Sequence, residues 1–227
     1  MEKVKSVVYA ETLTKVFQNG ADVLALNNVS LKVAEGEFLA VTGPSGSGKT
    51  TLLNLIGTLD VPTEGRIVVN DIDTGTLKGN ALADFRRENI GFVFQFFNLV
   101  PVLTALENVM LPLLPYQRRL DFDLEAQARD LLTAVSLESR MHHLPSQLSG
   151  GEQQRTAIAR ALVNTPKVVL ADEPTGNVDS QAGKEIILLL RQLNLDRRVT
   201  VILVTHNEVI SQEADRVVRL RDGSVVR

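Results

Sequence analysis

The chain has 227 residues, 44% of them hydrophobic and 22% charged, with a formal net charge of 24 − 27 = −3 at pH 7. This length allows one large domain or two small ones, and the acidic balance argues against non-specific nucleic-acid binding, which needs a basic surface. The sequence contains no cysteine, which excludes disulfides, thiolate metal sites and a cysteine nucleophile. The longest apolar runs, residues 186–190 and 199–204, are far shorter than the ~18–20 residues of a membrane span.

The N-terminal stretch MEKVKSVVYAE carries two lysines but lacks an apolar segment long enough for a secretory signal. We therefore expect the chain to stay in the cytoplasm. Its first ~35 residues alternate apolar and polar side chains, at 4–9 and again at 29–33, which predicts half-buried antiparallel strands.

Four short continuous apolar runs follow, at residues 38–42, 91–94, 168–171 and 200–204, and they suit strands buried on both faces. Helical patterns separate these runs; Leu52, Leu53 and Ile56 form one of them. Because buried strands alternate with helices, the fold class is predicted to be α/β with a mostly parallel sheet.

The stretch from about residue 83 to residue 160 has a different pattern from the rest of the chain. It contains few apolar runs of the buried-strand type, and Pro112 and Pro115 interrupt a leucine-rich segment. Within this stretch, residues 123–137 place their apolar side chains on one helical face. We predict an inserted helical subdomain here, between core segments of about 1–82 and 161–227. Near the end, Asp222 and Gly223 mark the turn of a predicted hairpin, after which we expect no further domain.

A phosphate-binding loop is predicted directly after the run at 38–42. Its residues match the pattern G-x-x-x-x-G-K-[ST], and they are Gly43, Pro44, Ser45, Gly46, Ser47, Gly48, Lys49 and Thr50. Glycines let the backbone N–H groups curl around phosphate oxygens, and the helix that follows presents its positive end to the anion. Lys49 carries charge to the β- and γ-phosphates, the Thr50 hydroxyl suits Mg²⁺, and Thr51 adjoins the site. The alternative is a glycine-rich turn with a chance lysine.

An acidic pair, Asp172 and Glu173, follows the run at 168–171. Asp172 lies at the carboxyl end of that predicted strand, where it can hold the hydration shell of Mg²⁺. Glu173 is placed to polarise an attacking water as a general base. Alternatively, Asp172 is a helix cap before Pro174.

A second anion-binding turn is predicted where Ser149, Gly150, Gly151 and Glu152 open a helix. This turn has no lysine and lies roughly a hundred residues after the first. One nucleotide does not need two such helix ends from a single chain, so we expect two chains packed head to tail, each lending this turn to the other's γ-phosphate. Alternatively, Ser149 is an ordinary N-cap before a glycine turn.

The chain resembles the ATP-binding subunits of ABC transporters, because LSGGEQQR matches that family's signature sequence and the other family motifs occur in the family's order. Gln95 matches the Q-loop glutamine, Asp179 the D-loop aspartate and His206 the switch histidine. Phe17 stands where the family places an aromatic ring that stacks on adenine, most often a tyrosine. The family's catalytic carboxylate falls on Glu173.

The resemblance implies a P-loop NTPase core with an N-terminal antiparallel β-subdomain and the helical insertion. It also implies that two copies enclose two ATP molecules, with Mg²⁺ held by Thr50, Gln95 and, through its hydration shell, Asp172. Glu173 then polarises the water and His206 aligns it with the γ-phosphate.

Each transferred role has a structural alternative. Gln95 is otherwise a polar strand end, and His206 a cap or loop residue. Asp179 also fits an N-cap of the helix that follows it. Phe17 also fits a core aromatic near a strand end.

Short stretches, at residues 97–101, 105–109 and 172–177, resemble the exporter branch for lipoprotein release and macrolide export, the LolD/MacB group. This branch implies a membrane permease, a periplasmic adaptor acting through it, and a position on the inner face of the membrane. We expect helices around residues 94–106 to carry motion to the permease, and we expect no nucleic-acid partner. The alternatives are a soluble ABC ATPase and an ATPase that regulates a membrane partner without transport.

Overall fold

The computed structural model describes residues 5–19 and 21–226. Its N-terminal sheet is four-stranded and antiparallel, with strand order β2-β1-β4-β5. The four strands are β1 (Ser6–Asn19), β2 (Ala21–Ala34), β4 (Glu64–Val69) and β5 (Ile72–Asp73). The predicted antiparallel pair is therefore confirmed, and β4 and β5 extend it.

The second sheet has six strands in the order β10-β9-β3-β8-β7-β6. They are β3 (Phe38–Thr42), β6 (Ile90–Val93), β7 (Val168–Asp172), β8 (Thr200–Val204), β9 (Arg216–Arg221) and β10 (Ser224–Val226). All neighbours are parallel except the β9–β10 hairpin, whose turn residues Asp222 and Gly223 have positive φ angles of 47° and 74°. The four buried strands and the hairpin of the sequence prediction are confirmed.

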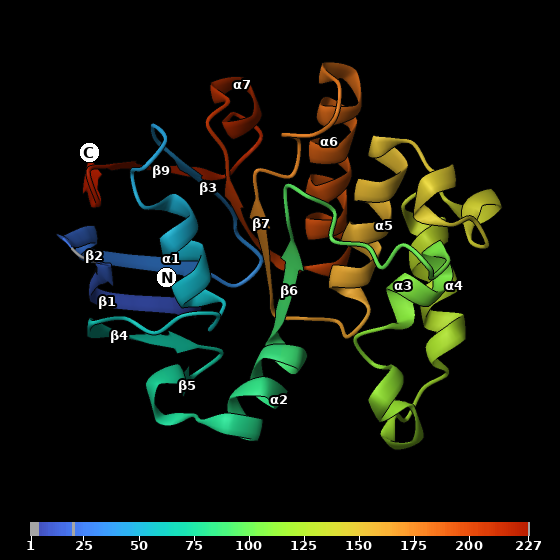
Figure 1. Ribbon diagram of the computed structural model, residues 1–227, viewed down its shortest axis with the longest axis horizontal. Helices are drawn as coiled ribbons and strands as arrows, with labels where there is room; N and C mark the ends of the chain where they lie inside the picture. The colour runs from blue at the N-terminus through green and yellow to red at the C-terminus, as the bar shows by residue number, and fades with distance from the viewer. Residues whose placement is uncertain (1–4, 20, 227) are drawn as a thin grey trace.

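The α-helices lie beside this sheet (Figure 1). They are α1 (Lys49–Ile56), α2 (Gly79–Asn89), α3 (Ala105–Met110), α4 (Leu124–Ala134), α5 (Gly150–Leu162), α6 (Ser180–Arg197) and α7 (Glu208–Ser211). Short 3₁₀ turns span Thr74–Thr76, Leu114–Arg119, Glu138–Arg140 and Pro145–Gln147. In Figure 1, α1 and α5 lie on opposite sides of β6 and β7.

One detail differs from expectation in the region of residues 83–160. Strand β6, predicted from the apolar run at 91–94, lies within this mostly helical range and belongs to the six-stranded sheet. Residues 94–104 form a loop and α3 begins at Ala105, so only the end of the range 94–106, around which helices were expected, is helical. The cause is the buried Asn108, whose side-chain amide satisfies backbone groups of residues 100–104 that a helix would pair internally.

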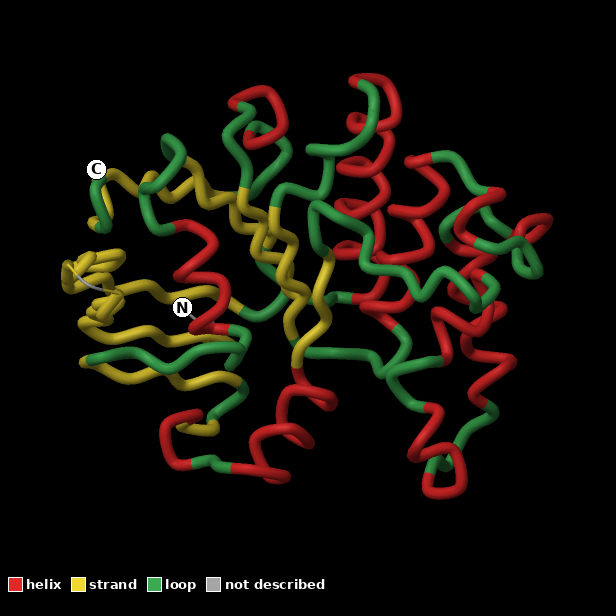
Figure 2. The backbone as a smooth tube through the Cα atoms, viewed as in Figure 1, coloured by secondary structure: helices red, strands yellow, loops and turns green. Residues whose placement is uncertain are grey.

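The six-stranded sheet separates two hydrophobic cores, because successive side chains of a strand point to opposite faces. On β7, Val168 and Leu170 enter the core shared with α1 and the antiparallel sheet, whereas Val169 and Ala171 enter the core shared with α3 to α6. Strand β8 alternates in the same way. Figure 2 shows the result, with strands gathered towards one end of the molecule and most helices towards the other.

No helix in the described part of the chain combines the length and apolar composition needed to cross a bilayer.

Candidate active site

The residues that follow four parallel strands lie together at one edge of the sheet. Gly43 follows β3, His206 comes shortly after β8, Glu173 follows β7 and Gln95 comes shortly after β6. Because β3, β8, β7 and β6 are successive neighbours, residues far apart in sequence meet at this carboxyl edge. Ligands of open parallel sheets bind at this edge.

The loop from Gly43 to Gly48 has the backbone that the sequence pattern requires. Gly43, Gly46 and Gly48 have φ angles of 150°, 77° and 97°, values that side-chain-bearing residues rarely adopt. A Cβ on Gly43 would lie 2.1 Å from the Leu220 carbonyl oxygen, and one on Gly48 would lie 2.5 Å from that of Ala25. The loop is therefore built on glycine both by conformation and by close packing.

Lys49 opens α1 and is buried, with its Nζ donating to the carbonyl oxygens of Gly43 and Pro44 at 2.9 and 2.8 Å. The ammonium group thus lies inside the loop. The buried Ser47 hydroxyl has no hydrogen-bond partner in the described residues. A cradle of backbone N–H groups, a buried cation and an unsatisfied hydroxyl fits the phosphate groups of a nucleotide.

Thr50 lies in the first turn of α1 and Asp172 ends β7, and the Thr50 hydroxyl donates to Asp172 Oδ1 at 3.2 Å. Burial raises the pKa of Asp172, against the lowering effect of the Thr50 hydrogen bond. A hydroxyl and a carboxylate are oxygen ligands of the kind Mg²⁺ takes beside substrate phosphates. The described residues contain no group of three or more His, Cys, Asp or Glu side chains that could hold a metal ion.

Glu173 and His206 lie together at the same edge. His206 Nδ1 is 3.1 Å from Glu173 Oε2, and the Glu173 carboxylate is mostly buried whereas His206 is exposed. Glu173 has a positive φ of 44°, and its N–H donates to the Val204 carbonyl oxygen of β8. The acid is therefore held by its backbone, and its side chain faces the residue that was expected to align the water.

Gln95 packs against the loop that follows Glu173. A Cβ on Gly176 would lie 2.7 Å from Gln95 Nε2, so the Gln95 side chain lies directly against Gly176. Asn177 Nδ2 donates to the Gln95 carbonyl oxygen at 2.9 Å. The sequence pattern assigned no role to Asn177, because its partner lies 82 residues away.

Ser149 and Asp179 both cap helices, as their structural alternatives required. Ser149 and Glu152 form a capping box at the start of α5, and the backbone N–H of Ser149 lowers the pKa of Glu152. Asp179 accepts hydrogen bonds from Gln181 and Ala182 at the start of α6, and the Ala182 N–H lowers its pKa.

Both caps line one surface hollow together with Gly150, Gly151 and Asn177, and residues 43–51 do not line it. Ser149 and Asp179 are thus brought together, apart from the phosphate loop of their own chain.

Phe17 lies near the end of β1 and keeps 36% of its surface exposed, which does not fit the core alternative. Its cross-strand partner is Val23 of β2. Two residues further along β2, Ala25 touches the phosphate loop at Gly48. At about 3.4 Å per strand residue, the ring lies about 7 Å along the strand from that contact, within the reach of one nucleotide.

Comparisons with known proteins agree with this geometry. The family model described as ABC transporter matches residues 26–176, more than half of the chain. The lipoprotein-releasing system ATP-binding protein LolD of Anaeromyxobacter dehalogenans is 50% identical over 88% of this chain and 84% of its own length. The macrolide export ATP-binding/permease protein MacB of Bdellovibrio bacteriovorus is 49% identical. That match covers 94% of this chain but only 32% of the MacB protein.

Among solved structures, the ATP-binding cassette MJ0796 in a dimeric, post-hydrolysis state bound to ADP and Pi matches with a TM-score of 0.88. That match has 46% identity and covers 97% of both chains. The similarity therefore extends over the antiparallel sheet, the parallel sheet and the helical segment together.

Proposed function

This chain belongs to the ABC transporter family and is an ATP-hydrolysing cassette of it, and on that premise we propose that it drives a LolD/MacB-type membrane permease. Two copies bind two ATP molecules head to tail and separate after hydrolysis. The observation that carries the proposal is the hollow at Ser149 and Asp179, which lies apart from the chain's own phosphate loop. A second copy supplies the nucleotide that this hollow faces.

We propose these roles for the residues at the sheet edge. Lys49 and the backbone of residues 43–51 hold the phosphates, and Phe17 stacks on the base. Glu173 accepts the proton of the attacking water, and His206, which lies 3.1 Å from it, keeps the water in line with the γ-phosphate. Because phosphoryl transfer needs little covalent assistance, positioning and charge stabilisation account for most of the rate.

Mg²⁺ is the second proposed cofactor, and the residues fit it. Thr50 is the proposed direct ligand, Gln95 a second one, and Asp172 acts through the hydration shell. Bound there, the ion neutralises charge on the β- and γ-phosphates. The binding of a cation next to Asp172 also opposes the effect of burial on its pKa.

From the partner chain, Ser149, Gly150, Gly151 and Glu152 contact the γ-phosphate through the N-terminus of α5. Asp179 lies beside them in the same hollow. The γ-phosphate thus bridges two chains, and its loss on hydrolysis weakens the bridge, giving a two-state element controlled by the nucleotide.

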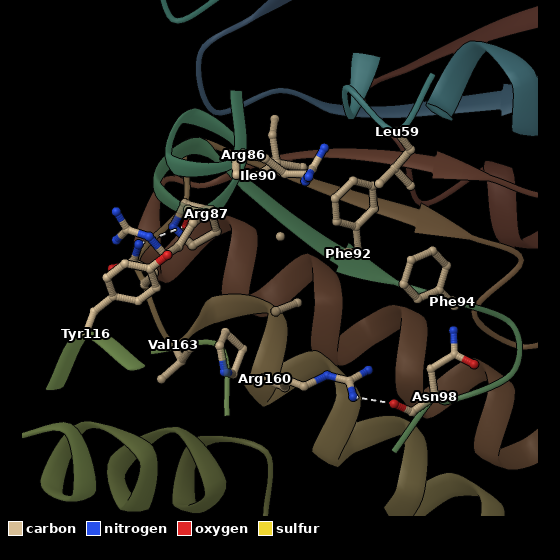
Figure 3. A pocket seen from close by; sticks show the side chains of 16 residues that line it. Leu59, Arg86, Arg87, Ile90, Phe92, Phe94, Asn98, Tyr116, Arg160 and Val163 are labelled. Atoms are coloured by element: carbon tan, nitrogen blue, oxygen red, sulfur yellow. Dashed lines mark hydrogen bonds between the residues drawn. The ribbon is translucent and has the colours of Figure 1, made fainter. Parts of the chain in front are cut away.

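A groove suited to the permease lies between the sheet core and the helical segment (Figure 3). It is a cavity of about 480 Å³ with Arg160 on one side and the stacked rings of Phe92 and Phe94 on the other. Arg160 donates to the carbonyl oxygens of Phe97 and Asn98, so the groove is tied to the loop that follows Gln95. We place permease docking here, so that loop 94–104 transmits motion in place of the helices first expected.

The remaining proposals follow the same branch. The chain is cytoplasmic and lies on the inner face of the membrane through its permease, and a periplasmic adaptor acts through that permease. The helical part is a moving subdomain inserted into the ATP-binding core. The relatives named for lipoprotein release and macrolide export favour transport over a regulatory or soluble ATPase role.

The first test measures the oligomeric state of Glu173→Gln by size exclusion, with and without ATP and Mg²⁺. This substitution leaves the phosphate-binding groups intact but removes the proton acceptor. We expect loss of turnover by at least about 100-fold and an ATP-dependent dimer. In Lys49→Ala, ATP binding itself is expected to weaken, so no dimer forms.

Wild-type hydrolysis by Glu173→Gln would show that another group is the base. A monomer that binds ATP tightly would mean either that dimer closure needs the permease or that the turn at Ser149 does not act on the nucleotide of a second copy. Repeating the measurement with the co-expressed membrane partner separates these two explanations.

A further inference from the structure

Lys15 is a buried cation next to the proposed base-stacking ring. Leu13, Lys15 and Phe17 share one face of β1, which packs towards α1. Only 8% of Lys15 is exposed, whereas Phe17, at the edge of the same face, is 36% exposed. A lysine is rarely buried to this extent unless every donor has a partner.

Each of the three N–H donors of the Lys15 ammonium is accounted for. One donates to Asp60 Oδ1 at 2.7 Å and one to the Val61 carbonyl oxygen at 2.9 Å. The third side of the ammonium faces the ring of Phe17, with Nζ 4.9 Å from the ring centroid. This distance is within the range of a cation–π contact.

The anchor of Lys15, Asp60, lies in the turn that follows α1, the helix after the phosphate loop. Asp60 Oδ1 also accepts the Val61 N–H, and the Asp60 N–H donates to the Asn54 carbonyl oxygen in α1. The cross-strand partner of Lys15 is Leu26, whose side chain touches Gly48. Lys15 thereby connects the Phe17 ring to the turn after α1, and its cross-strand partner lies against the end of the phosphate loop.

We propose that Lys15 is a positioning residue for the nucleotide base, a role that rests on the proposed ATP site. Its ammonium occupies the inner face of the Phe17 ring, so the base stacks on the outer face. Ring and phosphate loop then keep one fixed separation, and ATP binds without first ordering the ring.

The test compares two ligands that differ in having a base. Calorimetric titrations with ATP and with inorganic tripolyphosphate, both in EDTA to prevent hydrolysis, are made on wild type, Lys15→Met and Phe17→Ala. We expect Lys15→Met to weaken ATP binding about five-fold and to leave tripolyphosphate binding within about two-fold. Phe17→Ala is expected to weaken ATP binding about ten-fold with the same selectivity.

Lys32 provides a matched control on the same sheet, because its Nζ lies 5.0 Å from the ring centroid of Tyr9. Lys32→Met removes the same kind of contact away from the nucleotide and is expected to bind both ligands as wild type does. If Lys15→Met does not fold, Asp60→Asn loosens the anchor and leaves the lysine in place. This variant is expected to weaken ATP binding alone, by about two- to three-fold.

Equal losses for ATP and tripolyphosphate would mean that Lys15 only supports the phosphate loop, and would overturn the proposal. So would unchanged ATP binding in Lys15→Met when Phe17→Ala loses it. If Phe17→Ala also binds ATP normally, the base contact of the proposed function fails instead.

Discussion

Glu173 adopts a left-handed backbone conformation, with φ at 44°. For a residue with a side chain this costs on the order of 1–3 kcal/mol, which the surrounding hydrogen bonds must offset. The Glu173 N–H donates to Val204, and its carbonyl oxygen accepts from the Gly176 N–H, both at 3.0 Å. The carboxylate is thus aimed at His206 by the backbone rather than by rotamer choice alone.

Asp215 is one of the carboxylates whose partners make the stability of this protein depend on pH. It accepts two hydrogen bonds from the Arg191 guanidinium and one from the Phe38 N–H, and the Arg191 side chain is the main cause of its lowered pKa. A lowered folded-state pKa means that the stabilisation is present above the ordinary carboxyl value of about 3.9. It is lost as the pH falls through the lower, folded-state value.

We therefore expect Asp215→Asn to lower the Tm by about 2–4 °C at pH 7, and the difference from wild type to shrink below about pH 4. Thermal unfolding followed by circular dichroism at pH 7, 5 and 3 measures this. Asp130→Asn, at an exposed position of α4, serves as the control and should change little. A difference that stays constant down to pH 3 would contradict the assignment.

At the scale of elements, four helices begin at a side chain that caps them. Thr104 caps α3, Asp123 caps α4, Ser149 caps α5 and Asp179 caps α6. Capping fixes where a helix starts, and it aims the remaining N–H groups of the first turn outward. For α5 these groups face the hollow, so capping and the proposed phosphate contact are two uses of one turn.

Asn108, on α3, fixes the loop that precedes that helix. It is fully buried, its Oδ1 accepts the Val100 N–H, and its Nδ2 donates to the carbonyl oxygens of Val100, Leu103 and Thr104. Asn108→Ala would leave several buried backbone groups without partners. We expect it to lower the free energy of unfolding by about 2–4 kcal/mol.

Urea unfolding of Asn108→Ala measures this loss. Asn164→Ala is the comparison variant, because Asn164 donates one hydrogen bond to the Arg87 carbonyl oxygen and is only partly buried. It should cost about 1 kcal/mol. Equal effects of the two substitutions would show that the loop does not depend on Asn108.

For the whole molecule, the groove of Figure 3 carries unpaired positive charge. Arg86 donates to the Thr58 carbonyl oxygen and Arg160 to two loop carbonyls, and neither has an acidic partner among the residues described. Burial lowers the pKa of Arg160, which reflects this lack of a counter-charge. An acidic segment of the permease would supply it.

Arg86→Glu is therefore expected to reduce co-purification of the multi-span partner at least about five-fold, because it places like charges together. Its ATPase activity without the partner should stay within about two-fold of wild type, since Arg86 lies outside the nucleotide site. Arg221→Glu reverses an exposed charge on β9 and should retain the partner. Full retention by Arg86→Glu would place docking elsewhere.

The buried strands could be predicted from sequence because burial on both faces produces continuous apolar runs. Strand β4 could not, since the first half of Glu64–Val69 is exposed and polar. The sequence motifs predicted which loops carry the site residues. They did not predict which of these loops contact one another. Lys15 meets Asp60 across 45 residues and Asn177 meets Gln95 across 82, and local patterns do not record such pairings.

The alternating burial of β7 and β8 makes the six-stranded sheet a wall shared by two cores. Neither of the two cores would fold as a separate fragment, because removing one of them would expose one apolar face of every central strand to water. Unfolding should thus proceed as a single cooperative event, and amide protons in β3, β7 and β8 should exchange only through it. The movement proposed for the helical part must therefore hinge in loops at the sheet edge, such as 94–104, without separating the two cores from the sheet.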